Sequence, residues 1–288
     1  MKISQKSAPK ALSIGVIAIS ITIVTIAIYF TAKLPSADFY NTFYPATRNI
    51  LKGQSPYDVA GFMSAPWGLI PLLPFALFPP VWAHGLYFVA CMCLLIYLAW
   101  RMRSNALAIV AFMLSPTVIG ALLVGNLDPP VIAGIFIPPA WGLLLLMVKP
   151  QVGLGVAFYY LVESYRQGKF LKVARVFTPV ILAYLLALVF FPLWFERMFN
   201  QPSNIWNRSL FPYSIPIGLF FLYLAIARRN VFFAMAATPF FAPYLTFYTY
   251  IVVQFALLHE DVEKVIRRDV LQVILCIFLW VIMLVFRL

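Results

Sequence analysis

Long stretches of apolar residues dominate this chain, and short polar stretches separate them. The segments 11–32 and 270–286 each hold enough apolar residues to cross a hydrocarbon layer of roughly 30 Å as a helix. Backbone N–H and C=O groups in lipid must be paired within the spanning segment, so helices are the expected element. We therefore predict an all-α polytopic membrane protein that forms one membrane domain over residues 1–288.

Two parts of the apolar pattern are interrupted by proline, which removes a backbone donor and kinks helices. Between 66 and 80 the chain carries five prolines, so we expect a short segment that dips into the membrane. A true span there would invert the orientation of everything from Arg101 onward. The segment 127–149 has Pro138-Pro139 at its middle, and each half rises only roughly 15 Å as a helix. We expect a re-entrant hairpin or two short tilted helices, enclosed by protein.

The other apolar segments complete the predicted set of spans. They lie approximately at 106–124, 151–162, 176–191, 211–227, 231–242 and 244–258. Several are shorter than the roughly 20 residues that a membrane helix needs, so we predict nine to eleven transmembrane or re-entrant helices. The polar stretch 33–64 follows the first span and is predicted to be an external loop that carries short interfacial helices.

The basic residues predict the orientation of the chain. Most of the 21 lysines and arginines fall on the N-terminal segment and on turns at 101–103, 166–175, 228–229 and 264–268. The positive-inside rule places these parts in the cytoplasm. The first apolar run is too long for a signal core, and no small-residue cleavage site follows it. We expect a multi-pass protein of the bacterial cytoplasmic (inner) membrane with a retained anchor and a cytoplasmic N-terminus.

The formal net charge of +12 does not point to nucleic acid, because the basic residues are spread over span ends. At those places they meet anionic lipid headgroups, so membrane lipids are expected partners and nucleic acid is not. Cys91, Cys93 and Cys276 lie in apolar segments without metal-ligand spacing. They are interpreted as packing residues, and no metal site is predicted.

Asp38 stands just beyond the first span, in a polar loop rich in aromatic residues. A carboxylate there can act as a general base, and partial burial under aromatic rings raises its pKa toward a useful value. The other interpretation is the N-cap of a short interfacial helix at 41–49. Tyr44 and Arg48 of the same loop are candidates for substrate binding. Arg48 shares a helix face with Lys52, and lipid headgroups are the alternative partner for both.

Gly125-Asn126-Leu127-Asp128 ends an apolar span, and Lys149 stands between two apolar runs at a helix break. An acidic residue at such depth is costly unless it faces a cavity or a polar partner. Asn126, Asp128 and Lys149 are therefore candidates for substrate binding. Lys149 can neutralise a phosphate or supply a point charge to a leaving group. Pairing between Lys149 and Asp128, or snorkelling of the lysine to the interface, are the structural alternatives.

Two further candidates lie in the second half of the chain. Arg208, in Trp206-Asn-Arg-Ser209, is predicted to be in an external loop, where it meets either a substrate phosphate or lipid headgroups. Tyr244 is a candidate for substrate contact. It shares a helix face with Tyr248, and packing is the alternative interpretation of that aromatic pair.

Several of these features resemble bacterial integral-membrane glycosyltransferases of the C superfamily. They are Asp38 after the first span, the turn Gly53-Gln-Ser-Pro-Tyr57 and the proline-rich stretch 65–80. The closer likeness is to mannosyltransferase-like enzymes that use polyprenyl-phosphate sugars. Gly125-Asn-Leu-Asp128 is similar to a Gly-Gln-x-Asn stretch of that family, Lys149-Pro150-Gln151 to its Lys-Pro element, and 239–250 to a late segment. Asn126 stands where the family has Gln, and the chain is shorter than expected for the family.

The resemblance implies an inverting transfer of a mannose-like sugar from a polyprenyl phosphate to an acceptor hydroxyl at the external face. Asp38 would be the general base, and Lys149, with Arg208, would contact the donor phosphate. It implies no metal or other cofactor, since the lipid-linked sugar phosphate is the donor substrate. The alternative is a non-catalytic accessory or scaffold subunit of a membrane complex, which would bind other membrane protein subunits. A small-solute transporter ranks last, because acidic residues concentrate near span ends and leave no polar pathway.

Overall fold

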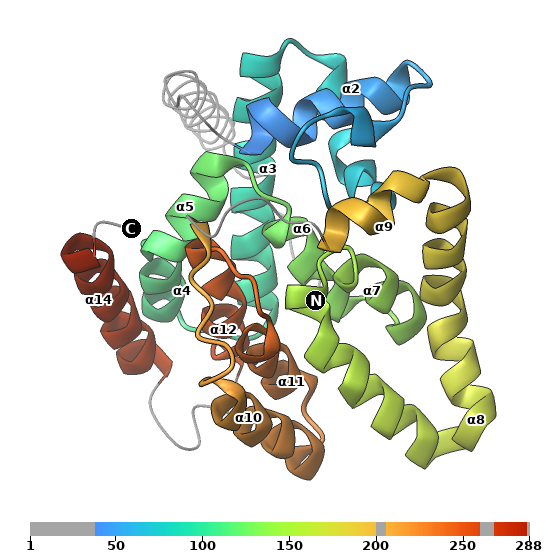
Figure 1. Cartoon of the computed structure of the whole chain (residues 1–288). Helices are drawn as coiled ribbons and strands as arrows, with labels where there is room; N and C mark the ends of the chain where they lie inside the picture. Colours follow the sequence, from blue (N-terminus) through green and yellow to red (C-terminus); the bar gives the residue numbers. More distant parts are fainter. Residues whose placement is uncertain (1–37, 200–205, 260–267, 287–288) are drawn as a thin grey trace, which may run out of the picture.

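The computed structural model describes residues 38–199, 206–259 and 268–286, and these residues form helices without a strand (Figure 1). The predicted all-α class is confirmed. The expected first span, 11–32, lies outside the described residues.

The polar segment after the first span folds as short helices, as expected. They are the π-helix η1 (Phe39–Phe43), the α-helix α2 (Tyr44–Leu51) and the 3-10 turn η2 (Pro56–Asp58). Helix α2 ends where Gly53 adopts a positive φ of 71°, a conformation that favours glycine. Figure 1 shows these elements at the top of the molecule, above the main helices.

The proline-rich stretch does not form a helix long enough to span. It folds as two 3-10 helices, η3 (Pro66–Leu72) and η4 (Phe75–Leu77). The long helix α3 (Pro80–Arg101) begins only at the last of the prolines, which occupies a position where its missing N–H costs nothing. The dipping segment expected before a full span is thus two short helices that lead into α3.

The segment expected as one span at 106–124 is broken in the structure. Helix α4 (Ala106–Met113) ends before Ser115, whose side chain caps α5 (Pro116–Val124), and the two helices are bent by 55°. Pro116 explains the break, because a proline cannot continue the hydrogen-bond ladder of α4 but fits the first position of a new helix.

The segment 127–149 is a compact helical hairpin, in keeping with the first of the two expected forms. One arm contains α6 (Asp128–Ile132) and η5 (Ala133–Phe136), and the other is α7 (Pro139–Leu146). The arms touch where Gly134 meets Gly142. A Cβ on Gly142 would lie 2.3 Å from the Gly134 carbonyl oxygen. Glycine at this crossing lets the arms approach closely, so the two ends of the hairpin return to the same place.

Helix α8 (Pro150–Phe190) is bent into two arms at Gly168 and Lys169, whose backbone angles are not helical. The arms form a V at the right of Figure 1. Each rises by roughly 27 to 31 Å, close to the thickness of a bilayer core. The two separate spans expected at 151–162 and 176–191 correspond to these arms. The amphipathic helix α9 (Pro192–Phe199) follows the second arm.

The C-terminal part packs against the first arm of α8 and against α4. Its elements are α10 (Ile215–Arg228), α11 (Val231–Ala237), η7 (Thr238–Phe241), η8 (Phe247–Tyr250), α12 (Ile251–Ala256) and α14 (Arg268–Phe286). Helix α11 packs on α8 and α10, and α14 packs on α4. The 3-10 helix η8 packs against α5.

Within the described residues two helices are long and apolar enough to cross a membrane, α3 and α8, and the bent pair α4–α5 makes a third if it counts as one span. Large apolar side chains such as Phe170, Leu171, Val189 and Leu284 are exposed on α8 and α14, as on a surface that faces lipid. A helical protein with membrane-spanning segments is therefore supported. The count of nine to eleven helices stays a prediction, as does the orientation of the chain.

Candidate functional site

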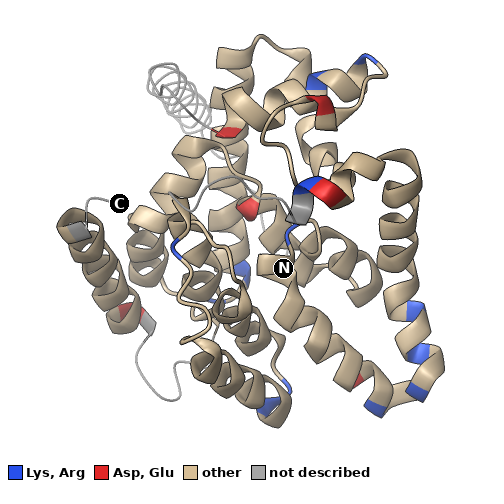
Figure 2. Ribbon diagram, in the orientation of Figure 1, with Lys and Arg blue, Asp and Glu red and all other residues tan. Residues whose placement is uncertain are grey.

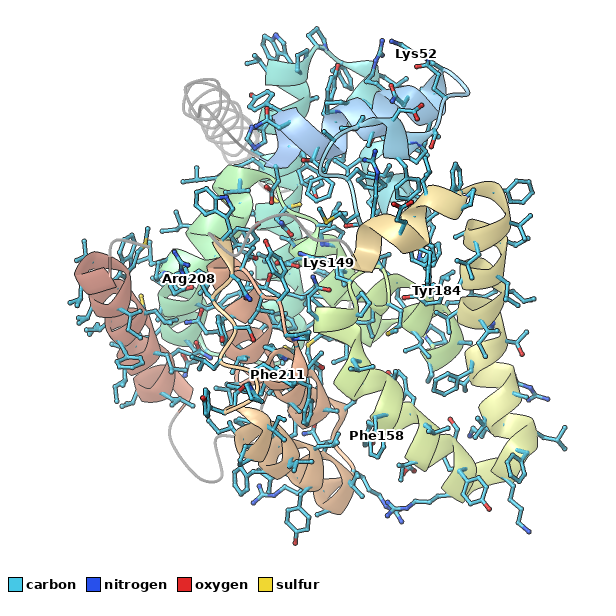
Figure 3. The ribbon with its side chains drawn as sticks, viewed as in Figure 1. Lys52, Lys149, Phe158, Tyr184, Arg208 and Phe211 are labelled. Carbon is cyan, nitrogen blue, oxygen red and sulfur yellow. The ribbon has the colours of Figure 1, made fainter. Side chains whose placement is uncertain are left out.

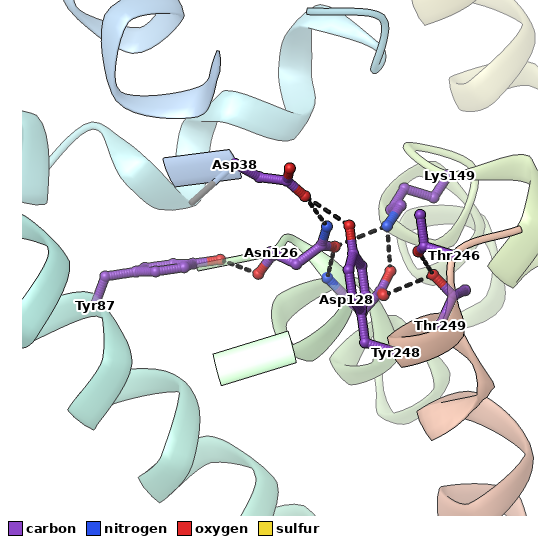
Figure 4. A network of polar contacts seen from close by, with 8 residues as sticks. All are labelled: Asp38, Tyr87, Asn126, Asp128, Lys149, Thr246, Tyr248 and Thr249. Carbon is purple, nitrogen blue, oxygen red and sulfur yellow. Dashed lines mark hydrogen bonds and ion pairs between the residues drawn. The ribbon is translucent and has the colours of Figure 1, made fainter. Parts of the chain in front are cut away.

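Four of the residues singled out in the sequence meet in one network of polar contacts (Figure 4). They are Asp38 at the start of η1, Asn126 between α5 and α6, Asp128 at the first position of α6, and Lys149 at the end of the hairpin. Lys149 is 7%, Asn126 3% and Asp128 0% exposed, and Asp38 is half-buried. The network therefore lies inside the fold, and only its Asp38 end approaches the surface.

Asn126 is the centre of this network. Its Nδ2 donates to Asp38 Oδ2 at 3.0 Å, and its Oδ1 accepts from Lys149 Nζ at 2.7 Å and from the Asp128 backbone N–H at 3.1 Å. Its backbone carbonyl accepts from the Tyr87 hydroxyl of α3 at 2.9 Å. A carboxamide suits this place because its nitrogen faces a carboxylate and its oxygen faces an ammonium group.

Lys149 and Asp128 form a buried ion pair. Lys149 Nζ contacts Asp128 Oδ1, while Asp128 Oδ2 accepts from Thr249 Oγ1 at 3.0 Å. The Thr249 hydroxyl in turn contacts Thr246 Oγ1 at 2.9 Å. The pairing considered from the sequence is confirmed. A buried pair is stable only when further hydrogen bonds satisfy its atoms, and Thr249 and Asn126 supply them.

Asp38 occupies the N-cap position of η1, but its side chain does not cap the helix. Its side chain makes no capping hydrogen bond to η1, so the capping interpretation is wrong. The carboxylate instead accepts two hydrogen bonds on Oδ2, from Asn126 and from the Tyr248 hydroxyl at 2.6 Å. Within the described residues nothing contacts Oδ1 at hydrogen-bond distance. The contacts turn one oxygen inward and leave the other available.

The end of α5 places Asp38 against Asn126. Gly125 ends α5 with a positive φ of 69°, and a Cβ there would lie 2.6 Å from the Cβ of Phe39 and 3.0 Å from His84 Nε2. Phe39 stacks on the His84 ring, with 4.7 Å between the ring centroids. The His84 ring is buried, and the backbone of Leu122 and Leu123 lies beside its nitrogens. Glycine at 125 thus allows η1 to sit directly on the loop that carries Asn126.

A cavity of about 480 Å³ opens beside Lys149, a size typical of sites for small ligands. Its polar lining includes Lys149, Gln151, Asn207 and Tyr244. The rest is apolar and aromatic and includes Met63, Leu154, Tyr184, Trp194 and Phe241. Figure 3 shows Lys149 and Tyr184 in the central part of the molecule. Lys149 therefore belongs to both the buried network and the wall of the cavity.

Tyr244 connects the cavity to Asp38. Burial and then the charge of Asp38 raise the pKa of the Tyr244 phenol above its usual value, which places this cavity-lining residue within electrostatic range of the carboxylate. Burial, followed by the charge of Asp38 and the hydrogen bond to it, raises the pKa of Tyr248 far above its usual value. Tyr248 therefore stays protonated and donates to Asp38 at every physiological pH.

The other predicted residues lie outside the network. The Tyr44 hydroxyl donates to the Phe78 carbonyl at 2.9 Å, and Arg48 Nη1 donates to the Ala76 carbonyl at 3.1 Å. Both side chains hold α2 against the proline-rich stretch. Arg208 is half-buried and follows the cavity residue Asn207, and its backbone N–H donates to the Leu245 carbonyl.

Four members of the network were not among the predicted site residues: Tyr87, Thr246, Tyr248 and Thr249. Tyr248 was interpreted as a packing residue, because a helix would place it on the same face as Tyr244. That shared helix face is wrong, since Tyr244 is not helical and Tyr248 belongs to η8. In the structure the Tyr248 ring carries the donor to Asp38. No sequence signal marked Thr249, which stands among other hydroxyl-bearing residues of the same stretch. The described residues contain no group of three or more His, Cys, Asp or Glu side chains placed to hold a metal ion.

Comparison of the chain with models of protein families, with curated proteins and with solved structures finds no match.

Proposed function

We propose that this protein is a membrane glycosyltransferase that moves a mannose-like sugar from a polyprenyl phosphate to an acceptor hydroxyl, with Asp38 as general base. The observation that carries the proposal is the link from Asp38 through Asn126 to Lys149. This link joins a carboxylate that has one available oxygen to a lysine in the wall of a cavity.

The Asp38 carboxylate has the environment that a general base needs. Tyr248 and Asn126 fix its direction by holding Oδ2, and Oδ1 stays available to take a proton. A carboxylate that acts as base on an attacking hydroxyl produces inversion at the sugar carbon.

The cavity suits a lipid-linked sugar phosphate. Lys149 has three N–H donors, of which Asp128 and Asn126 use two. The third is available to an oxygen of a phosphate in the cavity. The donor is a phosphodiester with one negative charge, and loss of the sugar leaves a polyprenyl phosphate with two. Because Asp128 balances the charge of Lys149, the leaving phosphate needs a further cation, and Arg208 beside the cavity residue Asn207 is the candidate. Trp194, Tyr184 and Tyr244 offer ring faces to a sugar, and the apolar lining suits an isoprenoid chain.

The proposed reaction is a single displacement. The acceptor oxygen attacks the anomeric carbon, and the bond from that carbon to the phosphate oxygen breaks. The electron pair leaves with the polyprenyl phosphate, while the acceptor proton passes to Asp38 Oδ1. Lys149 and Arg208 stabilise the charge that develops on the leaving phosphate. The site lies at the external membrane face, in a protein whose N-terminus is cytoplasmic.

The test is transfer of labelled mannose from polyprenyl-phosphate mannose to a membrane lipid and glycan extract by the purified protein. The Asp38→Asn variant keeps both hydrogen-bond partners in reach but cannot take a proton, so we expect the transfer rate to fall by at least about 100-fold. The control is Asp58→Asn. Asp58 lies in the same polar segment, is exposed and is outside the network, so its variant should transfer at the wild-type rate.

An Asp38→Asn variant as active as the wild type would contradict the proposal. Unfolding temperatures of both variants within a few degrees of the wild type are needed to assign the loss to chemistry. Donor binding adds a second measurement, because Asp38→Asn should still bind polyprenyl-phosphate mannose.

One observation favours the second candidate, a non-catalytic subunit of a membrane complex. Lys149 and Asp128 satisfy each other, with Asn126 and Thr249 completing the contacts, so the buried part of the network is stable without a substrate. Co-purification with other membrane subunits, no transfer by the resulting complex, and unchanged assembly in Asp38→Asn would favour this candidate.

A further inference from the structure

A second and larger cavity, of about 620 Å³, lies away from the Asp38 network. It is formed where the first arm of α8, the start of its second arm and the turn between α10 and α11 meet. Its apolar lining includes Pro138, Pro139, Val176 and Phe232. None of the residues predicted from the sequence to form a site belongs to it.

Three cationic side chains from two separate elements border this cavity. Lys172 and Arg175 come from α8, and Arg229 comes from the turn after α10. Figure 2 shows basic residues gathered at the α8 bend and at the end of α10, at the bottom of the view. Glu163 is the acidic residue of the described lining, and Gln167 donates a hydrogen bond to it at 2.5 Å.

Arg175 and Arg229 have no ion pair with any described residue. Among the described residues Lys172 donates only to the neutral side chain of Gln167. The border of the cavity therefore carries an excess of positive charge. Tyr159 and Ser164 add hydroxyl groups inside it, and Arg229 lies within electrostatic range of the Tyr159 hydroxyl.

The backbone at Arg229 supports a role for its side chain. Arg229 ends α10 in the left-handed conformation, with φ 50° and ψ 44°. Glycine is the usual residue at such a helix end, because a Cβ makes this conformation unfavourable. An arginine in this conformation costs stability, and such costs are common where a side chain is needed for function.

We propose that this cavity binds a phosphate group, held by Lys172, Arg175 and Arg229, with the apolar lining in contact with whatever the phosphate carries. Arginine forks match phosphate oxygens in pairs, and lysine adds a point charge. A membrane phospholipid and a water-soluble phosphate compound share this chemistry. The site is separate from the Asp38 network, so the inference does not depend on the proposed sugar transfer.

The test uses two variants that remove the same charge and relieve the same backbone conformation. Arg229→Gly deletes a cation of the cavity, and Arg103→Gly deletes an exposed arginine that also has a positive φ, 56°, but does not line the cavity. Glycine suits both positions, so both variants are expected to be at least as stable as the wild type. Native mass spectrometry of the full chain in detergent then measures binding of phosphatidylglycerol, phosphatidylcholine and inorganic phosphate.

We expect Arg229→Gly to weaken binding of phosphatidylglycerol or inorganic phosphate about tenfold, as for loss of one charge-assisted contact. Arg103→Gly should leave the binding of both probes unchanged. If phosphatidylglycerol alone shows this dependence, the ligand is a membrane lipid. If inorganic phosphate also binds and its binding is also weakened by Arg229→Gly, the ligand is a soluble phosphate compound. Equal losses of binding in both variants would overturn the proposal, since general attraction to a basic surface would explain them. Binding of both probes that does not change in Arg229→Gly would overturn it as well.

Discussion

Among the single side chains, Lys149 and Asp128 dominate the energetics of the site, because both charges are almost entirely removed from water. Burying a charge costs several kcal/mol, and the partner and its hydrogen bonds offset that cost. A charged pair in the interior is therefore sensitive to the loss of either member.

We predict that Lys149→Met lowers the free energy of unfolding by about 3 to 5 kcal/mol, because Asp128 would be left as an uncompensated buried charge. Equilibrium unfolding in mixed micelles measures the change. The double variant with Asp128→Asn should recover part of the loss. Lys52→Met, at an exposed lysine, should stay within about 0.5 kcal/mol of the wild type. An equally small effect at Lys149 would show that the ion pair does not stabilise the fold.

The sequence was informative about these residues for a physical reason. Charged groups inside apolar segments are costly, so Asp128 and Lys149 were recognisable without a structure, and Asp38 was recognisable beside its span. Their roles were harder to predict. The cap interpretation of Asp38 was as consistent with its neighbours in the chain as a network role, and only its contacts with Asn126 and Tyr248 separate the two.

At the level of helices and turns, two features bring the network together. The glycine crossing in the α6–α7 hairpin returns the chain so that Lys149 comes back to Asp128. Gly125 at the end of α5 has no side chain, so Phe39 of η1 packs directly against it. This contact brings Asp38, the residue before Phe39, next to Asn126.

We predict that Gly125→Ala lowers the free energy of unfolding by about 1 to 3 kcal/mol more than Gly53→Ala does. Both glycines have a positive φ near 70°, so both substitutions carry the same backbone strain. Only the Cβ at 125 meets other atoms, 2.6 Å from Phe39 and 3.0 Å from His84, whereas the one at 53 meets nothing within 4 Å. Thermal unfolding of the two purified variants gives the comparison, and equal losses would contradict the close contact.

Helix boundaries were predictable to different degrees. Residues 211–227 and 270–286 were expected as helices and correspond closely to α10 and α14. The break at Ser115 was missed, although Ser-Pro is a common helix start, because apolar residues continue on both sides and the hydropathy pattern does not change there.

For the chain as a whole, the long apolar helices agree with a membrane protein, while the orientation rests on the distribution of basic residues. The α2 end with Lys52 and the α8 bend with Lys169 lie at opposite ends of the molecule (Figures 1 and 3). These two exposed lysines are therefore suitable positions for a test of the predicted orientation.

We predict that Lys52→Cys is labelled by a membrane-impermeant maleimide on intact cells, and that Lys169→Cys is labelled only after permeabilisation. The background variant lacks Cys91, Cys93 and Cys276. The reverse pattern would invert the predicted orientation and place the Asp38 site in the cytoplasm. Labelling of both positions from the same side would contradict a membrane-spanning arrangement.

The distribution of apolar and charged residues along the sequence was enough to establish that this chain is helical and apolar. It also showed that a few charged residues need a partner. Both conclusions follow from the burial of apolar groups and from the cost of burying charge, which act on each segment separately. The partners themselves came from the folded chain. Asp38 meets Asn126 across 88 residues and Tyr248 across 210. Contacts at such separations depend on how the hairpin returns and how α5 meets η8, which no single segment encodes.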